Sequence, residues 1–326
     1  MSVTRRQLMT GLASGLAAST FPLSSMAADW PNRPIRLIVP YAAGGSADAV
    51  TRIVGQRLSE RVGQPVVVEN RPGAGTIVGT DYASKQAPDG HTLVFSASGL
   101  PILPSSNKNF KLDLNKDLTP VSELVRGGFV VVSNPSMPFR TFQEMIAYAK
   151  SNPGKLSYSA AGLGTSVQLT GEYLKALTGT FMVCIPYAGS APALGAVLSN
   201  EVSLFIDPVN TVKPHIESGR LIGLVQTSKN RSPILNQVPT SAEVGLPDFD
   251  VTYWMGFHAP GGMAPGLART ISDHLSAIVR EPEISKRLTG MGFEIAGTTP
   301  EEFGKLVNAD QERWAKVIRD ANLKFN

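Results

Sequence analysis

The segment from Ile35 to Arg52 constrains the fold more than any other part of the chain. A short apolar strand, residues 35–39, passes through a turn that contains Gly44 and Gly45 into a helical pattern that begins at Ser46. Such a turn leaves free backbone N–H groups at the positive end of the helix dipole. The segment therefore predicts a place that can hold a carboxylate, a phosphate or a similar anion without a charged side chain.

Strand and helix signals alternate along the following residues. Apolar runs at residues 66–68 and 92–96 enclose a helical stretch from Thr76 to about Gln86. The runs are apolar throughout and do not alternate with polar residues, which is typical of strands covered on both faces. The sequence therefore predicts an α/β fold with a mostly parallel sheet flanked by helices.

The second half of the chain repeats this design. A strand at residues 156–160 leads into a Gly162–Ser166 loop and a helix, and a strand at 181–185 leads into Pro186 and Tyr187 before another helix. A third strand, residues 202–206, ends in Asp207. Ligands of open α/β sheets bind at the carboxyl ends of the strands. We therefore expect two sheets, each with a polar, glycine-rich mouth.

Two long apolar or aromatic stretches, residues 130–132 and 253–258, are the candidates for segments that cross between two lobes. If both cross, the first lobe consists of residues 28–128 and 250–326, and the second lobe consists of residues 129–249. This division is an expectation about the boundaries.

The first 27 residues predict a secretory signal peptide. Arg5 and Arg6 precede a weakly apolar stretch, and small residues lead to an expected cleavage near Ala27. The two arginines fit a twin-arginine signal and an ordinary Sec signal equally, and either one sends the mature chain to the periplasm. Cys184 is the only cysteine, so the exported chain has no internal disulfide.

Signals for catalysis, cofactors and nucleic acids are weak. The glycine-rich loops lack the G-x-G-x-x-G and Walker patterns of nucleotide sites, and the four histidines have no partners at metal-ligand spacing. No run of lysine and arginine indicates nucleic-acid binding. We therefore expect no catalytic site, no metal and no cofactor, although an exported hydrolase that uses Ser166 or Ser190 stays open as an alternative.

Structural roles compete with ligand binding at several polar residues. Asp48 either contacts a ligand or complements the helix dipole and pairs with Arg52, four residues further on. Thr165 and Ser166 either contact a ligand or only cap the helix that follows them.

An ordered set of motifs carries a family resemblance. The motifs are Trp30-Pro31-x-Arg33-Pro34-Ile35, Pro40-Tyr41-x-x-Gly44-Gly45-x-x-Asp48-x-x-x-Arg52, Asn70-Arg71-Pro72-Gly73-Ala74-Gly75, Ala87-Pro88-Asp89-Gly90, Gly162-x-Gly164-Thr165-Ser166, Pro186-Tyr187-x-Gly189-x-Ala191-Pro192, Phe205-x-Asp207 and Trp254-x-Gly256-x-x-Ala259-Pro260. Over nearly the whole mature chain they resemble the extracytoplasmic substrate-binding receptors of tripartite tricarboxylate transporters.

The resemblance implies a two-lobed, type II-like periplasmic binding protein, with a mostly parallel sheet in each lobe and a hinge between them. It implies capture of a small carboxylate, such as a di- or tricarboxylate, an acidic amino acid or an aromatic acid. The receptor would deliver this ligand to the membrane permease subunits of the transporter, and we expect it to be a monomer. A ligand sensor for a membrane signalling partner is the other alternative, because it would use the same binding chemistry.

The resemblance also implies which residues bind the ligand, largely through backbone amides and ordered waters. The expected contacts are Tyr41, Gly44, Gly45, Asp48, Gly73, Ala74, Gly75, Thr76, Ser96, Ser98, Thr165, Ser166, Tyr187, Ala191 and Asp207. Thr76 stands where the family usually has a glycine, Gln168 replaces a frequent histidine and Ala188 replaces a frequent lysine.

Overall fold

The computed structural model of the chain describes residues 30–160 and 162–325. The predicted signal peptide, residues 1–27, lies outside the described residues. Within the described part, no helix is both long enough and apolar enough to cross a membrane.

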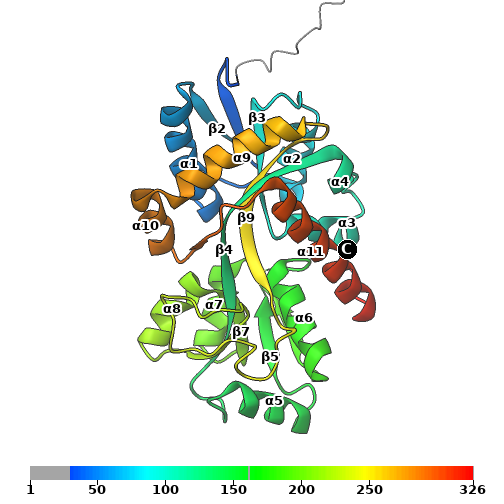
Figure 1. The fold of residues 1–326 in the computed structure, drawn as a ribbon. Helices are drawn as coiled ribbons and strands as arrows, with labels where there is room; N and C mark the ends of the chain where they lie inside the picture. Colours follow the sequence, from blue (N-terminus) through cyan, green and yellow to red (C-terminus); the bar gives the residue numbers. More distant parts are fainter. Residues whose placement is uncertain (1–29, 161, 326) are drawn as a thin grey trace, which may run out of the picture.

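Strands and helices alternate along most of the chain (Figure 1). The strands are β1 (Ile35–Val39), β2 (Val66–Asn70), β3 (Thr92–Ala97), β4 (Leu118–Ser133), β5 (Ser157–Ala160), β6 (Val183–Pro186), β7 (Leu204–Pro208), β8 (Ile222–Gln226), β9 (Thr252–Pro260) and β10 (Glu294–Ile295). The helices are α1 (Ser46–Val62), η1 (Ala74–Thr76), α2 (Ile77–Ser84), η2 (Leu100–Ile102), α3 (Leu103–Ser106), α4 (Leu114–Asp117), α5 (Phe142–Ser151), α6 (Ser166–Thr178), α7 (Ser190–Leu198), α8 (Val209–Glu217), α9 (Pro265–Arg280), α10 (Pro282–Gly290) and α11 (Pro300–Asp320).

The strands form two sheets that share the long strand β4. In the first sheet β1 pairs in parallel with β2 and β3, and β9 joins β3 to β4. In the second sheet β5 pairs in parallel with β6 and β7, and β7 and β8 both pair with β4. Figure 1 shows β4 running from the upper half of the molecule into the lower half.

The sheets contain antiparallel pairs that the βα alternation does not predict. Pairing is parallel among β1, β2 and β3 and among β5, β6 and β7, as expected, but β4 and β9 are antiparallel to each other and to their other neighbours. The chain leaves the first sheet on β4 and returns on β9, so the outgoing and returning strands run in opposite directions. No crossover helix is needed for such a pair.

Local sequence signals set the helix ends. Gly63 adopts a left-handed conformation (φ 69°) and ends α1, and its N–H donates to the Ser59 carbonyl. Two helices begin with a capping box, Thr141 with Glu144 at α5 and Thr299 with Glu302 at α11. These contacts satisfy the N–H groups that a helix leaves free at its start.

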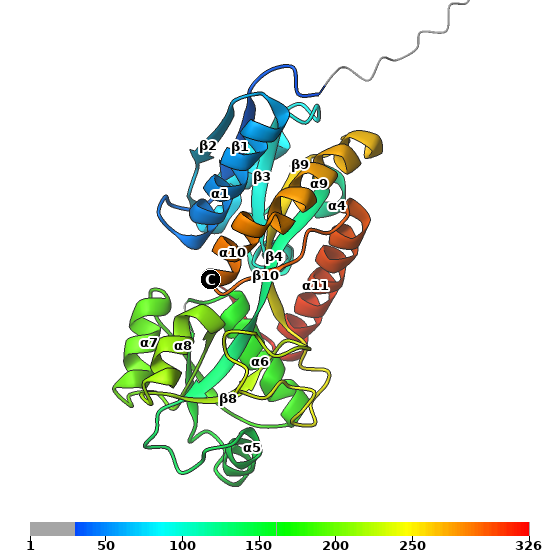
Figure 2. The same ribbon diagram turned by 60° about the vertical axis from the view of Figure 1, so that its left-hand side comes forward.

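The C-terminal helix α11 packs against elements of both sheets (Figure 2). Trp314 of α11 is buried and meets Tyr173 of α6 edge to face, with ring centroids 6.4 Å apart. Phe303, one turn from the start of the same helix, stacks edge to face on Trp254 of β9 at 5.1 Å. The helix therefore spans the junction between the two halves of the molecule.

Candidate ligand-binding cleft

A cavity of about 270 Å³, here called the inner cavity, lies where strand ends of both sheets meet. Its lining residues are Ser46, Ala97, Ser98, Phe129, Ser166, Val167, Ser190, Asp207, Pro208, Asn210, Thr211, Tyr253, Trp254, Met255 and Phe293. It shares Ala97, Ser98 and Ser166 with a larger neighbouring hollow of about 800 Å³, here called the outer hollow. Together the two spaces form a cleft between the halves of the molecule.

Four helices begin at the inner cavity. Ser46, Ser166 and Ser190 are the first residues of α1, α6 and α7, and Asn210 and Thr211 lie in the first turn of α8. No side chain caps α1, α7 or α8. Their first N–H groups and their positive dipole ends therefore face a space that suits an anion. Among the described residues that line this cavity, none is lysine or arginine.

The turn before α7 depends on Gly189 for its backbone conformation. Gly189 is the N-cap of α7 and has a φ of 136°, a conformation that residues with a Cβ atom rarely adopt. Glycine also offers no side chain to cap the helix or to fill the cavity. The N-terminus of α7 consequently stays open toward the cleft.

Among the described residues that line the inner cavity, Asp207 is the only one with a carboxyl group, and it is the second-last residue of β7. It is 3% exposed, and the Ser190 hydroxyl donates a hydrogen bond to its Oδ2 at 2.5 Å. Burial raises the pKa of this carboxyl to about 6. An acidic group thus lies among helix N-termini in a cavity whose other features favour an anion.

Aromatic side chains form an apolar wall of the inner cavity. Tyr253 lies between Phe129 and Phe293, with ring centroids 5.4 Å and 6.0 Å away. The Tyr253 hydroxyl is buried and has no hydrogen-bond partner among the described residues. Burial raises its pKa, and the nearby carboxyls of Glu294 and Asp207 raise it further. The wall therefore combines apolar surface with one unused polar group.

Asp48, an expected ligand contact, braces the loop after β1 and does not line either space. Its carboxylate accepts hydrogen bonds from the Gly44 N–H, the Arg52 Nε and the Asn70 Nδ2, each at 3.0 Å. These bonds, that from Arg52 first, hold the pKa of the Asp48 carboxyl at about 2. These contacts give Asp48 a structural role, because its side chain fixes the start of α1.

The expected contacts fall into four groups. Ser98, Ser166 and Asp207 line the inner cavity, and the residues that line the outer hollow are Tyr41, Gly75, Thr76, Ser98, Thr165 and Ser166. Ser96 is buried behind them, and its hydroxyl lies 2.7 Å from His258 Nδ1. Those that line neither space are Gly44, Gly45, Asp48, Gly73, Ala74, Tyr187 and Ala191.

Thr76 has a backbone conformation that explains why glycine is usual at this position. Its φ is 85°, in the left-handed region that favours glycine, and the family resemblance usually has glycine there. Its side chain lines the outer hollow. The substitution therefore places a threonine side chain in the cleft at some cost in backbone strain.

Sequence reasoning missed most of the inner wall. The missed residues include Ser46, Phe129, Asn210, Thr211, Tyr253, Trp254 and Phe293 in the inner cavity, and Asn107, Lys108 and Phe325 in the outer hollow. Ser46 could have been found, because it begins a helix after a glycine turn. The aromatic residues lie on or beside the strands that cross between the sheets, and no local pattern indicates that they meet.

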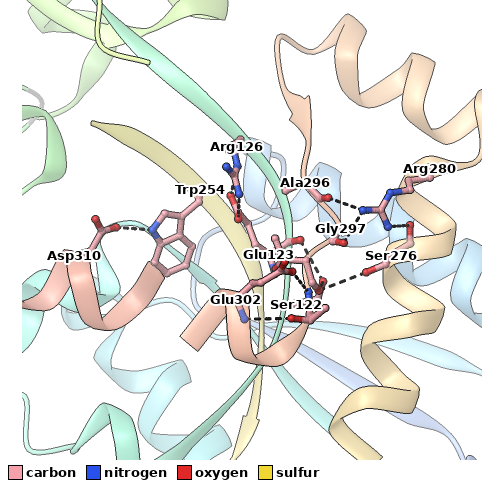
Figure 3. Close-up of polar contacts among 12 residues, drawn as sticks. Ser122, Glu123, Arg126, Trp254, Ser276, Arg280, Ala296, Gly297, Glu302 and Asp310 are labelled. Atoms are coloured by element: carbon pink, nitrogen blue, oxygen red, sulfur yellow. Dashed lines mark hydrogen bonds and ion pairs between the residues drawn. The ribbon is translucent and has the colours of Figure 1, made fainter. Parts of the chain in front are cut away.

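Polar contacts behind the cleft fix the crossing strands (Figure 3). The Trp254 indole N–H donates to Asp310 of α11 at 2.8 Å. On β4, Arg126 binds both carboxylate oxygens of the buried Glu123, whose pKa is raised by burial. Since Trp254 also lines the inner cavity, these contacts connect the cavity wall to the C-terminal helix.

Known proteins resemble the chain over nearly its full length. A family model described as the tripartite tricarboxylate transporter family receptor matches residues 50–323. Protein BugT of Bordetella pertussis is 33% identical over 331 residues, covering all of both chains.

Two solved structures share the fold. The periplasmic binding protein BugD has a TM-score of 0.73 and 30% identity, and the match covers 91% of this chain and 100% of BugD. The Rpa4515 protein of R. palustris, solved with adipate, has a TM-score of 0.75 and 30% identity at the same coverage. These matches confirm the expected α/β periplasmic binding protein fold.

Proposed function

This chain belongs to the tripartite tricarboxylate transporter receptor family, and on that premise we propose that it captures a small carboxylate in the cleft and delivers it to a membrane permease. Its family is one of solute-binding receptors, so the chain is not an enzyme. The ligand classes proposed are di- and tricarboxylates, acidic amino acids and aromatic acids. Adipate in a relative's structure supports the first of these.

One observation carries the carboxylate proposal: four helices begin at an inner cavity, and no lysine or arginine is found among its described lining residues. The N-terminus of a helix contributes about 0.3–1 kcal/mol to the binding of an anion, and up to about 2 kcal/mol when the site is partly buried. Four such ends supply a substantial part of the roughly 8 kcal/mol that micromolar binding requires. Closure of the two lobes around the ligand would supply more, because it removes the anion from water.

The lobes proposed are residues 28–128 with 250–326, and residues 129–249. The two crossing strands support a hinge near Gly128 on β4 and near Thr252 on β9, which are register partners. We also propose that residues 1–27 export the chain by a Tat or Sec signal and that the mature receptor acts as a monomer in the periplasm, as periplasmic relatives suggest.

The test is a thermal-shift and calorimetry screen of the mature protein against small carboxylates. A ligand at 100 times its dissociation constant adds about 2.7 kcal/mol to the free energy of unfolding. That raises the melting temperature by roughly 4–5 °C for a chain of this size. If no carboxylate raises the melting temperature of the protein but sugars or cations do, the carboxylate proposal is wrong.

A matched pair of variants at Ser166 locates the binding site. Ser166 is the first residue of α6, where proline fits, and the preceding Thr165 has the extended conformation (ψ 157°) that precedes proline well. Ser166→Ala removes only the hydroxyl, whereas Ser166→Pro also removes a backbone N–H that faces the cavity. We expect the proline variant to bind the carboxylate about tenfold more weakly than the alanine variant, with equal stability in the absence of ligand.

A further inference from the structure

The inner cavity contains an acid that the binding of a simple carboxylate does not explain. Asp207 is 3% exposed and lines this cavity, and none of the described lining residues is a cation that could neutralise it. A buried ionised acid repels a second carboxylate unless a hydrogen-bond donor lies between them. A receptor for plain carboxylates would bind better with an uncharged residue at this position.

Asp207 has no evident structural task that requires its charge. It makes no ion pair among the described residues, and no side chain caps α8, the helix that follows it. Its polar neighbours are the hydroxyls of Ser190 and Thr211. A carboxylate has room for about four hydrogen bonds, so Asp207 keeps acceptor capacity toward the cavity.

Tyr253 is a second, independent group that points to a ligand. The side chain is 6% exposed, it lines the same cavity, and its hydroxyl has no partner among the described residues. Packing fixes its position, because a Cβ atom at Gly127 would lie only 2.4 Å from the Tyr253 hydroxyl oxygen. A buried hydroxyl without a partner costs about 1–3 kcal/mol, and a polar ligand group would remove that cost.

We propose that the receptor selects carboxylates that carry a hydroxyl or an amino group, with Asp207 as the acceptor for that group. This inference rests on the proposed function. A ligand hydroxyl would donate to Asp207 and accept from Tyr253, and a ligand ammonium would donate to both. The cavity of about 270 Å³ lies just below the usual range for ligand sites, roughly 300–1,000 Å³, so the part of the acid that enters it has only a few carbon atoms.

The test compares acids that differ only in the substituent. Calorimetry at pH 7.5 would use three sets: propionate, lactate and alanine; succinate, malate and aspartate; tricarballylate and citrate. We expect a hydroxy or amino member of at least one set to bind at least tenfold more tightly than its parent acid. The comparison of hydroxy with amino members shows which donor the site takes.

Two substitutions at Asp207 assign the preference to this residue. Asp207→Asn keeps a neutral acceptor and should abolish the preference for an amino group, and Asp207→Leu should abolish both preferences. Binding of the parent acid by each variant reports that it has folded. Asp273→Asn, the same change at an exposed acid on α9, is the matched control and should leave every ratio unchanged.

Two results would overturn the inference while the proposed function stands. One is that the parent acids bind to the unmodified protein as tightly as their hydroxy and amino derivatives. The other is that both Asp207 variants retain a tenfold preference. If no carboxylate in the panel binds at all, the proposed function itself is wrong, and this result is distinct from either of the others.

Discussion

Replacing Asp48 by asparagine should destabilise the protein at neutral pH and much less in acid. Asp48 is 5% exposed, and its carboxylate holds Gly44, Arg52 and Asn70 through three hydrogen bonds of 3.0 Å. These contacts tie the glycine turn after β1 to α1 and to the end of β2. Asparagine keeps the shape of the side chain, but it removes the charge that Arg52 needs.

The pKa of Asp48 gives the size of the effect. The Arg52 bond, with those from Gly44 and Asn70, lowers this pKa from 3.8 to about 2 despite the cost of burial. A tenfold change in a proton affinity corresponds to about 1.4 kcal/mol. The ionised carboxylate therefore stabilises the folded protein by roughly 2 kcal/mol, after a reduction for the solvent around the half-exposed Arg52.

The sign of the pH dependence follows from the lowered pKa. The contribution is fully present well above the unfolded pKa of about 4 and is lost as the pH falls through about 2. The difference in the free energy of unfolding between the two proteins should thus be about 2 kcal/mol at pH 7 and about half of that at pH 3.

Urea denaturation at pH 7 and pH 3 measures both values. Asp81→Asn is the matched control, because Asp81 of α2 pairs with Lys85 at the same four-residue spacing but both side chains are exposed. The loss of stability in this variant should not exceed about 0.5 kcal/mol. Equal stability of Asp48→Asn and the unmodified protein at pH 7 would refute the reasoning. So would a difference that is the same at both pH values.

Two further predictions concern buried groups beside the cleft. His258 is 2% exposed, and burial lowers the pKa of its imidazole from 6.5 to about 3. As the pH falls, this imidazole is therefore protonated in the unfolded chain before it is protonated in the folded protein. Between pH 7 and pH 5 the unmodified protein should therefore lose about 2 kcal/mol more stability than His258→Asn in urea titrations; parallel losses would contradict this. Gly127→Ala should lower the free energy of unfolding by about 1–3 kcal/mol, because its Cβ would meet the Tyr253 hydroxyl at 2.4 Å, and an unchanged urea midpoint would show that the ring moves freely.

Prediction from sequence worked best where local residues decide the structure. The βα units and the glycine turns before the helices were found because each depends on residues close in the chain. It worked less well at strand ends. The expected strand at 202–206 is observed at Leu204–Pro208, because the ladder with β4, and not the apolar run alone, sets which residues pair.

The candidate site was only partly predictable for the same reason. Thr165, Ser166 and Asp207 were expected as contacts and face the cleft, since glycine turns and strand ends indicate where helices start. The wall formed by Phe129, Tyr253 and Phe293 was not expected, because these residues are far apart in the chain and meet only through β4 and β9.

The sequence by itself determined that strands lead through glycine turns into helices, and hence that the chain has open helix N-termini suited to an anion. Turn and cap geometry depends on neighbours within a few residues, so it is readable without a structure. Only the tertiary structure decided that four of those helices begin at one cavity, that Asp48 turns away from it and that Asp207 lies buried within it. Those outcomes depend on which strands pair and on where each side chain points, and contacts between distant segments fix both.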